Sequence, residues 1–457
     1  MIMMIEIQKV FSILESSGYE VYIAGGAVRD MIMGVEPNDY DFTTNAIPSE
    51  IIKIFEYNGF RVIPTGIKHG TVTVIIDNIP FQITTYRIDK ECDGRHCKVQ
   101  FTRSIEEDIK RRDLSINALI MDVNNNVTDI VGGVLDIHNK VIRTVGNPRE
   151  RFTEDYLRML RAIRFATELD FSIERNTFNI IRELHPNLTK ISRERIRDEF
   201  SKIILSKHRV MGIMLLYTSN LIDIIIPEFS KLADTEQPPQ FHPEGDVLTH
   251  TLLILGQIEE GDNLEIILAT VLHDIGKLHT LMYDVEKKRI TFNGHDIVGA
   301  EKAKEILRNL KYDNDTIQKV YYIISNHMKL HQRLSKTTIK KLMLKRIGNE
   351  YVYNNAFDDL VKLNRYELQA SLVDSNIEME DHKQLLIKIE NIKQEIEEEL
   401  DKRSLIRLVT GHDVIALGIE PGPIISEILQ EIEDAQLEGT IKTREEGLKL
   451  LGNIIAK

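Results

Sequence analysis

The sequence feature that most constrains the fold is a change of pattern near residue 148. Residues 19 to 130 alternate short runs of strand-forming residues, such as "GTVTVIID" and "PFQITTYR", with helical segments such as "PSEIIKIFEYNG". From about 148 to 220, apolar residues instead recur at three- and four-residue spacing, as in "YLRMLRAIRFATEL", and strand signals end. We therefore expect a multidomain chain in which an N-terminal α/β unit, a small mixed sheet with helices, is followed by all-α parts.

The length of 457 residues allows two to four domains, each with its own core. Proline and polar residues are concentrated in "TEQPPQFHPEGD", residues 235 to 246, which is therefore predicted to be a linker. Helices that carry most of the histidines follow it, and a short C-terminal unit ends the chain. The predicted parts are residues 1–138, 139–234, 240–376 and 377–457.

Charge, hydropathy and cysteine content narrow the class of protein. The formal net charge of −13 argues against a continuous basic coat, so a nucleic-acid partner would have to be held by local clusters of lysine and arginine. No stretch reaches the roughly 18 uncharged apolar residues of a membrane span, and no basic N-terminal region precedes a long apolar run, so a cytoplasmic location is expected. Cys92 and Cys97 are too few for a disulfide framework and are expected to be reduced.

Asp39 and Asp41 are the first candidate metal ligands. One residue separates them in the strand-like run "DYDFTT", so both side chains leave the same face of the strand. Paired carboxylates suit Mg²⁺, which commonly binds through one or two carboxylates together with substrate phosphates. The preceding "YIAGGAVRD" predicts a strand, a turn at Gly25 and Gly26, and a helix start that presents backbone N–H groups to phosphate beside Arg29. Together these residues predict a site for a nucleoside triphosphate and metal.

Five motifs in this order resemble those of one family. They are "GGAVRD", "DYDFTT", "RRDLSINALIMD" at 111 to 122, "RFTEDYLRMLRAIRFA" at 151 to 166 and "ISRERIRDEFSKIIL" at 191 to 205. The series resembles the class II tRNA nucleotidyltransferases and bacterial poly(A) polymerases of the polymerase β superfamily. This resemblance implies that residues 1–138 form a nucleotidyltransferase catalytic head, and that residues 139–234 form a helical neck that selects nucleotides and binds RNA.

The resemblance also implies roles for individual residues. Asp39 and Asp41 would be the catalytic pair that holds Mg²⁺, so that metal lowers the pKa of an attacking 3′-hydroxyl and neutralises charge at the α-phosphorus. The segment before residue 111 is also compatible with an ordinary charged helix, because Ser104 and Glu107 have the spacing of a capping box. The implied nucleotide-binding residues are Gly25, Gly26, Arg29, Arg111, Arg112, Asp113, Asn117, Asp155, Arg158, Arg161 and Arg164.

Two positions bear on how complete this resemblance is. Relatives often carry a third acidic residue on a nearby strand, where this chain has Gln82, and Asp77 is only a remote substitute. The existence of a third catalytic carboxylate is therefore left open. The loop from Asp89 to Val99 falls where the family has a flexible loop needed for the final adenosine, which weighs against an enzyme that adds only cytidine.

Asp155 and Arg158 are three residues apart on a predicted helix, so we expect them to be neighbours on one face. An ionised aspartate only accepts hydrogen bonds and an arginine only donates them. Cytosine and adenine both present an amine beside a ring-nitrogen acceptor, whereas uracil and guanine present the reverse. A fixed pair could accept C and A and reject U and G, because each mismatched polar group costs about 1 to 3 kcal/mol in a closed pocket. The alternative is an intrahelical salt bridge worth only about 0.3 to 0.5 kcal/mol.

Arginines and lysines after this pair form the candidate RNA contact. Arg161 and Arg164 continue at three-residue steps, toward the phosphates or the primer. The basic residues from 188 to 209 outnumber the acids and are the best candidate patch for an RNA backbone, with a salt-bridged helix surface as the alternative. They are Lys190, Arg193, Arg195, Arg197, Lys202, Lys207 and Arg209.

A second constellation is rich in histidine. His250, the adjacent His273 and Asp274, His295 and His327 follow one another at intervals, and imidazole with carboxylate is a standard mixture for divalent transition metals. The arrangement resembles the HD phosphohydrolase superfamily, so residues 240–376 are expected to be an HD metal-dependent domain with a second divalent metal.

Such domains close their site with an aspartate, whereas the matching position here is Glu367. Glutamate can bind metal but is one methylene longer, which leaves hydrolase activity open. Lys277 is expected to assist a phosphate, and His279 and His331 are expected to be incidental. The C-terminal residues 377–457 resemble the family's helical tail, which holds tRNA.

The main expectation is therefore an enzyme that adds CCA to tRNA 3′ ends from CTP and ATP, with Mg²⁺, without a nucleic-acid template, and with possible HD phosphohydrolase activity. The partners are then tRNA, CTP and ATP, with no membrane. The alternatives are a specialist that adds only A or only the two Cs, and a poly(A) polymerase. An alternative of another class is an HD phosphodiesterase whose head binds RNA, against which the intact Asp39 and Asp41 pair speaks.

Overall fold

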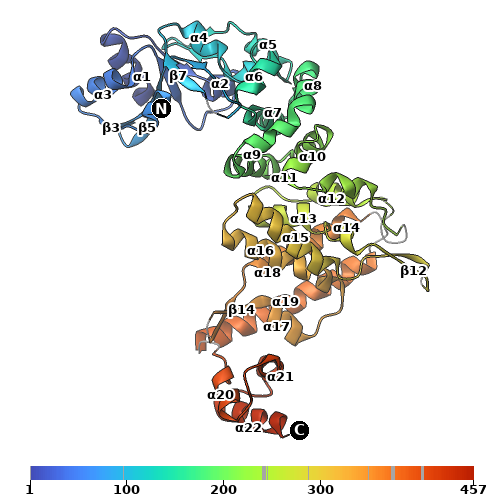
Figure 1. Cartoon of the computed structure of the whole chain (residues 1–457). Helices are drawn as coiled ribbons and strands as arrows, with labels where there is room; N and C mark the ends of the chain where they lie inside the picture. The colour runs from blue at the N-terminus through green and yellow to red at the C-terminus, as the bar shows by residue number, and fades with distance from the viewer. Residues whose placement is uncertain are drawn as a thin grey trace. The chain divides into compact units, whose positions relative to one another are not determined.

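The computed structural model describes residues 2–95, 97–238, 243, 245–286, 288–347, 349–371, 376–402 and 406–456. These residues form two compact units, one of residues 1–230 with 309–311 and the other of residues 231–308 with 312–457 (Figure 1). Residues 239–242 and 244, which belong to the predicted linker and to the start of the third predicted part, lie outside the described residues. The division into four parts stays a prediction.

The first unit is built on a seven-stranded sheet with the order β3-β4-β5-β2-β1-β8-β9. β2 and β5 run parallel and the other neighbours antiparallel, so the sheet is mixed, and the predicted fold class is confirmed. The strands are β1 Val21–Ala24, β2 Asp41–Thr44, β3 Arg61–Ile63, β4 Thr71–Ile76, β5 Ile79–Thr85, β8 Ile120–Met121 and β9 Val127–Thr128.

Helices α1 (Ile2–Ser16) and α3 (Pro48–Tyr57) pack on this sheet. The alternation in β4 buries Val72, Val74 and Ile76 on one face, as a half-buried strand requires. Phe42 of β2 lies between Phe11 of α1 and Phe81 of β5, with ring centroids 5.6 and 5.9 Å apart. This aromatic core fixes β2, which carries Asp41 at its first residue.

Helices continue the first unit after the head. α7 packs against both α9 and α10, and a Cβ at Gly212 of α10 would lie 2.6 Å from Ile203 and 2.9 Å from Thr167, so the three helices are closely packed there. One short parallel pair, β10 (Val141–Ile142) with β11 (Ser172–Ile173), interrupts the helical pattern. The helices are α6 Pro148–Glu154, α7 Leu157–Leu169, α8 Arg175–Leu184, α9 Arg193–Leu205 and α10 Arg209–Thr218.

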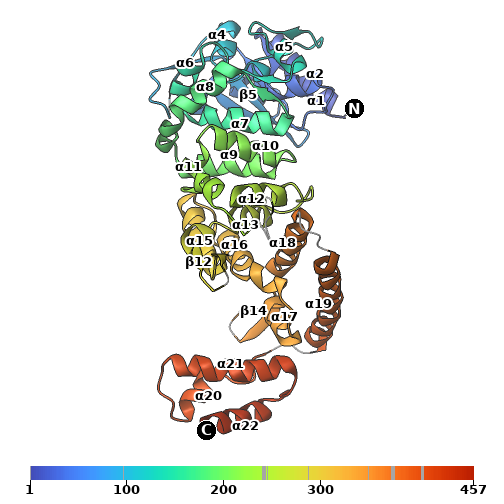
Figure 2. The same ribbon diagram turned by 90° about the vertical axis from the view of Figure 1, so that its right-hand side faces the viewer.

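The second unit is mainly helical and ends in a small three-helix tail (Figure 2). Two hairpins, β12 (Met282–Asp284) with β13 (Arg289–Thr291) and β14 (Leu344–Ile347) with β15 (Glu350–Tyr353), depart from the predicted absence of strands, because runs of three or four residues give little periodic signal. The helices used below are α12 Val247–Leu255, α13 Leu264–Leu272, α15 His295–Asn309, α16 Asn314–Asn326, α18 Ala356–Ala370 and α22 Arg444–Ile455.

Within the described ranges, no helix combines the length and the apolar character that crossing a membrane requires.

Candidate functional site

Asp39 and Asp41 lie together at the start of β2, and both residues are exposed. The strand register places Asp41 opposite Ala24 of β1 and Gln82 of β5. Partial desolvation and the like charge of Asp39 raise the pKa of Asp41, while Arg112 acts to lower it. Two carboxylates that repel each other at an open strand end fit a divalent cation, which would relieve that repulsion.

Gln82 therefore lies beside Asp41, at the strand position where relatives often carry a third acid. Asp77 lies in the turn between β4 and β5 and pairs with Lys9 of α1. Strand geometry separates the first residue of β5, Ile79, from Gln82 by about 10 Å, so Asp77 does not take the place of an acid at Gln82.

The turn at Gly25 and Gly26 leads from β1 into α2 (Gly26–Ile32). Gly25 has φ 76° and ψ −126°, a backbone conformation that residues with a side chain rarely adopt. A Cβ at this position would lie 3.3 Å from Nη1 of Arg112. Arg29 Nη1 donates to Asn117 Oδ1 at 2.7 Å, and Arg112 Nη1 donates to the Asn117 carbonyl at 3.3 Å. The structure thus brings the glycine turn, two guanidiniums and Asn117 together.

Asp108 of α4 (Ile105–Lys110) is a buried residue of this site that the sequence reasoning missed. Its carboxylate lies 2.7 Å from Arg111 and 3.2 Å from Arg112. Burial acts to raise the pKa of Asp108, but these two guanidiniums outweigh burial and lower it. The spacing of three and four residues from Asp108 to the arginines was the signal that could have identified it.

Asp113 joins the head to α7. Arg161 Nε donates to Asp113 Oδ2 at 2.6 Å. Burial acts to raise the pKa of Asp113, yet the guanidiniums of Arg161 and Arg158 bring it to about 2. The carboxylate is therefore ionised at neutral pH and holds the arginine face of α7 against the head.

Three arginines surround the ring of Phe165. The guanidinium carbons of Arg29, Arg161 and Arg164 lie 5.2, 5.5 and 3.9 Å from its centroid, within the range of cation–π attraction. Arg164 also donates to Glu199 of α9 at 2.6 Å, so its charge has a carboxylate partner within the protein.

Asp155 and Arg158 do not lie on one helix, so that prediction is wrong. α6 ends at Glu154, α7 begins at Leu157, and Asp155 between them is extended, with φ −151° and ψ 107°. A backbone bridge joins Asp155 to Gly94, and the Tyr156 N–H donates to the Gly94 carbonyl at 2.9 Å. This pairing with a distant segment interrupts the helix although the local periodicity favours its continuation.

The predicted pair also has other partners. Asp155 Oδ2 accepts from Arg195 of α9 at 2.7 Å. Arg158 pairs with Glu154 and lies 3.4 Å from Asp89.

The loop that docks on Asp155 contains both cysteines. Cys92 and Cys97 form a disulfide, so the expectation of two reduced thiols is wrong. Gly94 within the loop has φ 90°, and a Cβ there would lie 2.4 Å from the Tyr156 ring. The loop backbone therefore lies directly against the segment between α6 and α7.

Some residues of the predicted basic patch from 188 to 209 are already paired within the protein. Arg195 faces Asp155, and Arg209 is buried, with its Nε donating to the Ile204 carbonyl at 3.1 Å. Arg197 pairs with Asp198 at 2.8 Å. The role of the remaining residues in RNA binding stays a prediction.

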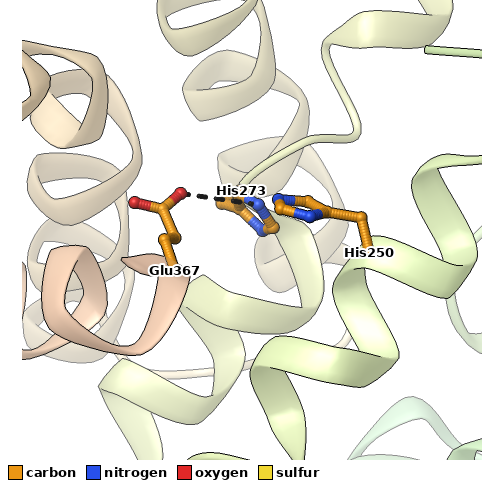
Figure 3. A group of neighbouring side chains, drawn as sticks. All are labelled: His250, His273 and Glu367. Carbon is orange, nitrogen blue, oxygen red and sulfur yellow. Dashed lines mark ion pairs between the residues drawn. The ribbon is translucent and has the colours of Figure 1, made fainter. Parts of the chain in front are cut away.

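The histidines predicted in the second unit meet in one buried cluster. The ligand atoms of His250, His273 and Glu367 lie within 4.8 Å of one another, and so do those of a second set, Asp274, His295 and His327 (Figure 3 shows the first set). His250 comes from α12, His273 and Asp274 follow α13, His295 begins α15, His327 follows α16, and Glu367 belongs to α18.

Backbone carbonyls orient three of these rings. His273, His295 and His327 each direct Nδ1 at the carbonyl three residues before, at 2.8, 2.8 and 2.6 Å, so Nε2 faces the cluster. The Nε2 atoms of His295 and His327 are 3.2 Å apart, and the buried Nε2 of His273 has no hydrogen-bond partner. That nitrogen lies 3.2 Å from Asp274 Oδ2. Ring nitrogens and carboxylate oxygens that face one another at these distances fit a bound cation.

Charge in the cluster also suits a metal. Burial lowers the pKa of His295, and lowers that of His327 to about 4, so both rings are neutral at pH 7. Burial acts to raise the pKa of Glu367, but the charge and the hydrogen bond of His331 are the largest opposing causes, and the pKa is about 2. Burial also acts to lower the pKa of His273, but the neighbouring Asp274 outweighs burial and raises it. The neutral rings of His295 and His327 and the ionised Glu367 therefore have the protonation states that bind metal.

Two neighbours complete this cluster. His331 Nε2 lies 3.0 Å from Glu367 Oε2, so the expectation that His331 is incidental is wrong. The buried Lys277 Nζ donates to Asp274 Oδ2 at 2.7 Å, which ties its charge to the cluster.

Three family descriptions match successive parts of the chain. Residues 21–143 match the poly A polymerase head domain, residues 170–232 match the probable RNA and SrmB-binding site of polymerase A, and residues 295–450 match the putative domain 2 of tRNA nucleotidyltransferase.

Solved structures with this fold include the CCA-adding enzyme of Bacillus stearothermophilus in complex with CTP, with a TM-score of 0.67 and 24% identity, covering 99% of this chain and 97% of that one. The Thermotoga maritima CCA-adding enzyme complexed with tRNA-CCA has a TM-score of 0.55 and 20% identity, covering 97% and 93%.

Curated relatives match over nearly their whole length. A CCA-adding enzyme of Ligilactobacillus salivarius is 32% identical over 443 residues, which are 95% of this chain and 93% of the relative. One of Enterococcus faecalis is 32% identical over 439 residues, covering 95% and 92%. The chain therefore belongs to the CCA-adding enzyme family of nucleotidyltransferases.

Proposed function

We propose that this chain adds CCA to tRNA 3′ ends from CTP and ATP, by Mg²⁺-dependent nucleotidyl transfer without a nucleic-acid template. The observation that carries the proposal is the adjacency of Asp39 and Asp41 to the arginine-lined turn at Gly25, because Asp41 pairs with Ala24 immediately before that turn. The names of the full-length relatives support the same reaction. Since tRNA and nucleoside triphosphates are cytoplasmic, we propose that location.

The residues of the head would divide the work as follows. Arg29 and Arg112 would bind the triphosphate beside the glycine turn, and the ionised Asp113 would accept a hydrogen bond near the ribose. Asp39 and Asp41 would hold Mg²⁺, which when bound lowers the pKa of the 3′-hydroxyl and neutralises charge at the α-phosphorus. Arg111, Arg161 and Arg164 remain proposed contacts for nucleotide or primer.

Asp155 and Arg158 would read the base. Asp155 offers only acceptors and Arg158 only donors, which complements the amine and ring nitrogen of cytosine and adenine. Because the two residues belong to different segments, each is oriented by its own neighbours and the base would fit between two independently held groups. Division into a catalytic head (1–138), a neck (139–234), an HD domain (240–376) and a tRNA-binding tail (377–457) completes this proposal.

Three tRNA transcripts, ending at the discriminator base, at C and at CC, test the function. The purified chain is incubated with Mg²⁺ and single labelled nucleotides, and product lengths are read on a sequencing gel. Addition of C, C and A that then stops is expected. Extension of only one transcript would indicate a specialist, and a long A ladder would indicate a poly(A) polymerase.

The histidine cluster supports a second candidate function. We propose that it binds a divalent metal ion and hydrolyses a phosphate ester, and the observation that favours this is the 3.2 Å separation of two ring nitrogens that both face inward. Metal would be held by His250, His273, Asp274, His295, His327 and Glu367. A cavity of about 440 Å³ lies next to the cluster, since its lining includes His331, which contacts Glu367.

Cobalt binding tests the metal site without any assay of activity. Co²⁺ added to chelator-treated protein is expected to give visible absorption bands at a stoichiometric ratio, and the His295→Ala variant is expected to lose them. The exposed His412 supplies a matched control, since His412→Ala should bind Co²⁺ as the unchanged chain does. Equal binding by all three proteins would contradict the proposal.

A further inference from the structure

Arg195 holds the carboxylate of Asp155 in one orientation. Its Nη2 donates to Oδ2 at 2.7 Å and its Nη1 to Oδ1 at 3.4 Å, so each of the two terminal guanidinium nitrogens faces one carboxylate oxygen. The backbone N–H of Leu157 donates to Oδ1 at 3.1 Å. A paired arrangement of this kind fixes the plane of the carboxylate as well as its position.

Arg158 is held by a separate set of groups. Its guanidinium pairs with Glu154 and lies 3.4 Å from Asp89, and it donates to the carbonyls of Arg151 and Arg111 at 3.1 and 3.4 Å. With its side chain only 12% exposed, Arg158 has little freedom to reorient. The acceptor and the donor of the proposed base reader are therefore kept apart.

We propose that Arg195 is a positioning residue for base selection and not a contact for the RNA backbone. This inference rests on the proposed function of Asp155 as the acceptor that reads cytosine and adenine. An ionised carboxylate has about four acceptor positions, and three donors occupy it here, which leaves one directed position for an exocyclic amine.

Removal of Arg195 would free the carboxylate to rotate. Asp155 and Arg158 are only three residues apart, and the Arg158 N–H donates to the Asp155 carbonyl at 3.0 Å, so the released carboxylate has a second guanidinium within reach. A carboxylate drawn toward Arg158 would no longer present its free acceptor position to the base. Lysine at position 195 would keep the charge but lose the two-nitrogen geometry.

Base selection by Arg195→Ala, Arg195→Lys and Arg197→Ala tests the inference. Arg197 is a matched control because it lies on the same helix and pairs with Asp198. Rates of single-nucleotide addition are measured on the transcripts ending at C and CC with each of the four triphosphates. Arg195→Ala is expected to reduce the preference for CTP over UTP by about 10- to 100-fold, the effect of one mismatched polar group. Arg195→Lys should be intermediate, Arg197→Ala should keep the preference, and the tRNA KM should stay unchanged in the Arg195 variants.

A contrary result is equally clear. If Arg195→Ala slows all four nucleotides by the same factor and raises the tRNA KM, Arg195 contacts the RNA backbone and the inference fails. Thermal unfolding of each variant excludes loss of fold as the cause. Should the unchanged chain extend no transcript, the proposed function fails separately, and equilibrium binding of CTP and UTP then decides the role of Arg195. Loss of CTP preference in Arg195→Ala alone supports it, and equal preference in all variants overturns it.

Discussion

Asp39 and Asp41 stand exposed at a strand end among guanidiniums, whereas His295 and His327 are buried and face each other across 3.2 Å. An exposed pair leaves room for substrate phosphates beside a metal, while a buried cluster fixes its donors before any ion arrives. The first site depends on the balance of charges around it and the second on burial and on hydrogen bonds to backbone carbonyls. The two should therefore respond differently to the same kinds of change.

Removal of the open carboxylates should have the largest effect. The Asp39→Ala, Asp41→Ala double variant is expected to lower tRNA extension by at least about 100-fold, because charge at the reacting phosphorus is no longer neutralised. Cobalt binding by the histidine cluster should be unchanged. Asp77→Asn is the matched control, since Asp77 pairs with Lys9 and should leave extension intact. If tRNA extension persisted without Asp39 and Asp41, these residues would not be the catalytic metal site, and the comparison of two metal sites would fail.

Changes at Glu367 test whether the buried cluster tolerates a shorter ligand. Glu367→Ala is expected to weaken Co²⁺ binding by at least about 10-fold, whereas Glu367→Asp should retain most of it and give up the 3.0 Å contact with His331. Isothermal titration of chelator-treated protein measures both. tRNA extension should be the same in both variants, and a parallel loss of extension would show that the sites are coupled.

In metal-free protein, the histidine cluster and the head should lose stability at different pH values. The pKa of His327 is lowered from 6.5 to about 4, so its contribution to stability is complete above pH 6.5 and is lost as the pH falls toward 4. The pKa of Asp113 is lowered from 3.8 to about 2, so its contribution is lost only below pH 3.8. Hydrogen exchange, corrected for intrinsic rates, should show the histidine helices opening at a higher pH than the head. Opening of both at one pH would contradict this.

Two glycines sharpen the comparison with smaller effects. A Cβ at Gly276 would lie 2.1 Å from the His295 carbonyl and 2.6 Å from the Gly299 nitrogen, so Gly276→Ala should displace α15 and cost about 2 kcal/mol. At Gly94 the neighbour is the Tyr156 ring, a side chain and not backbone, but the φ of 90° adds backbone strain, so Gly94→Ala should cost slightly more than about 1 kcal/mol. Calorimetry measures the loss of stability in both variants, with Gly452→Ala as the uncrowded control. A larger loss for Gly94→Ala than for Gly276→Ala would contradict this prediction.

Local patterns predicted much of the head. The alternation of β4 and β5 and the run "DYDFTT" indicated strands. The register then places Gln82 beside Asp41, where relatives often carry a third acid. Asp108 was within reach of the same reasoning, because its distance from Arg111 and Arg112 along a helix is visible in the sequence. The spacing of the histidines indicated the cluster, and the structure brings all the predicted members together.

Other features depend on segments far apart in the sequence. The break at Asp155 follows from its bridge to Gly94, and no glycine or proline marks it in "RFTEDYLRMLRAIRFA". His331 contacts Glu367, 36 residues later, and its place four residues after His327 did not by itself indicate that contact. The pairing of Cys92 with Cys97 could not be decided from the count of cysteines alone. The first two of these features arise from tertiary contacts that override local preference, whereas the disulfide joins cysteines only five residues apart.

The break between α6 and α7 has a consequence for insertions and deletions. Each residue turns an α-helix by about 100°, so one residue added to α7 between Arg158 and Arg161 would carry Arg161 away from Asp113. The same turn would carry the Phe165 ring away from Arg29. The segment between α6 and α7 cannot shift to absorb the added residue, because Asp155 is paired with both Gly94 and Arg195. This segment can therefore change in sequence over generations far more readily than it can change in length.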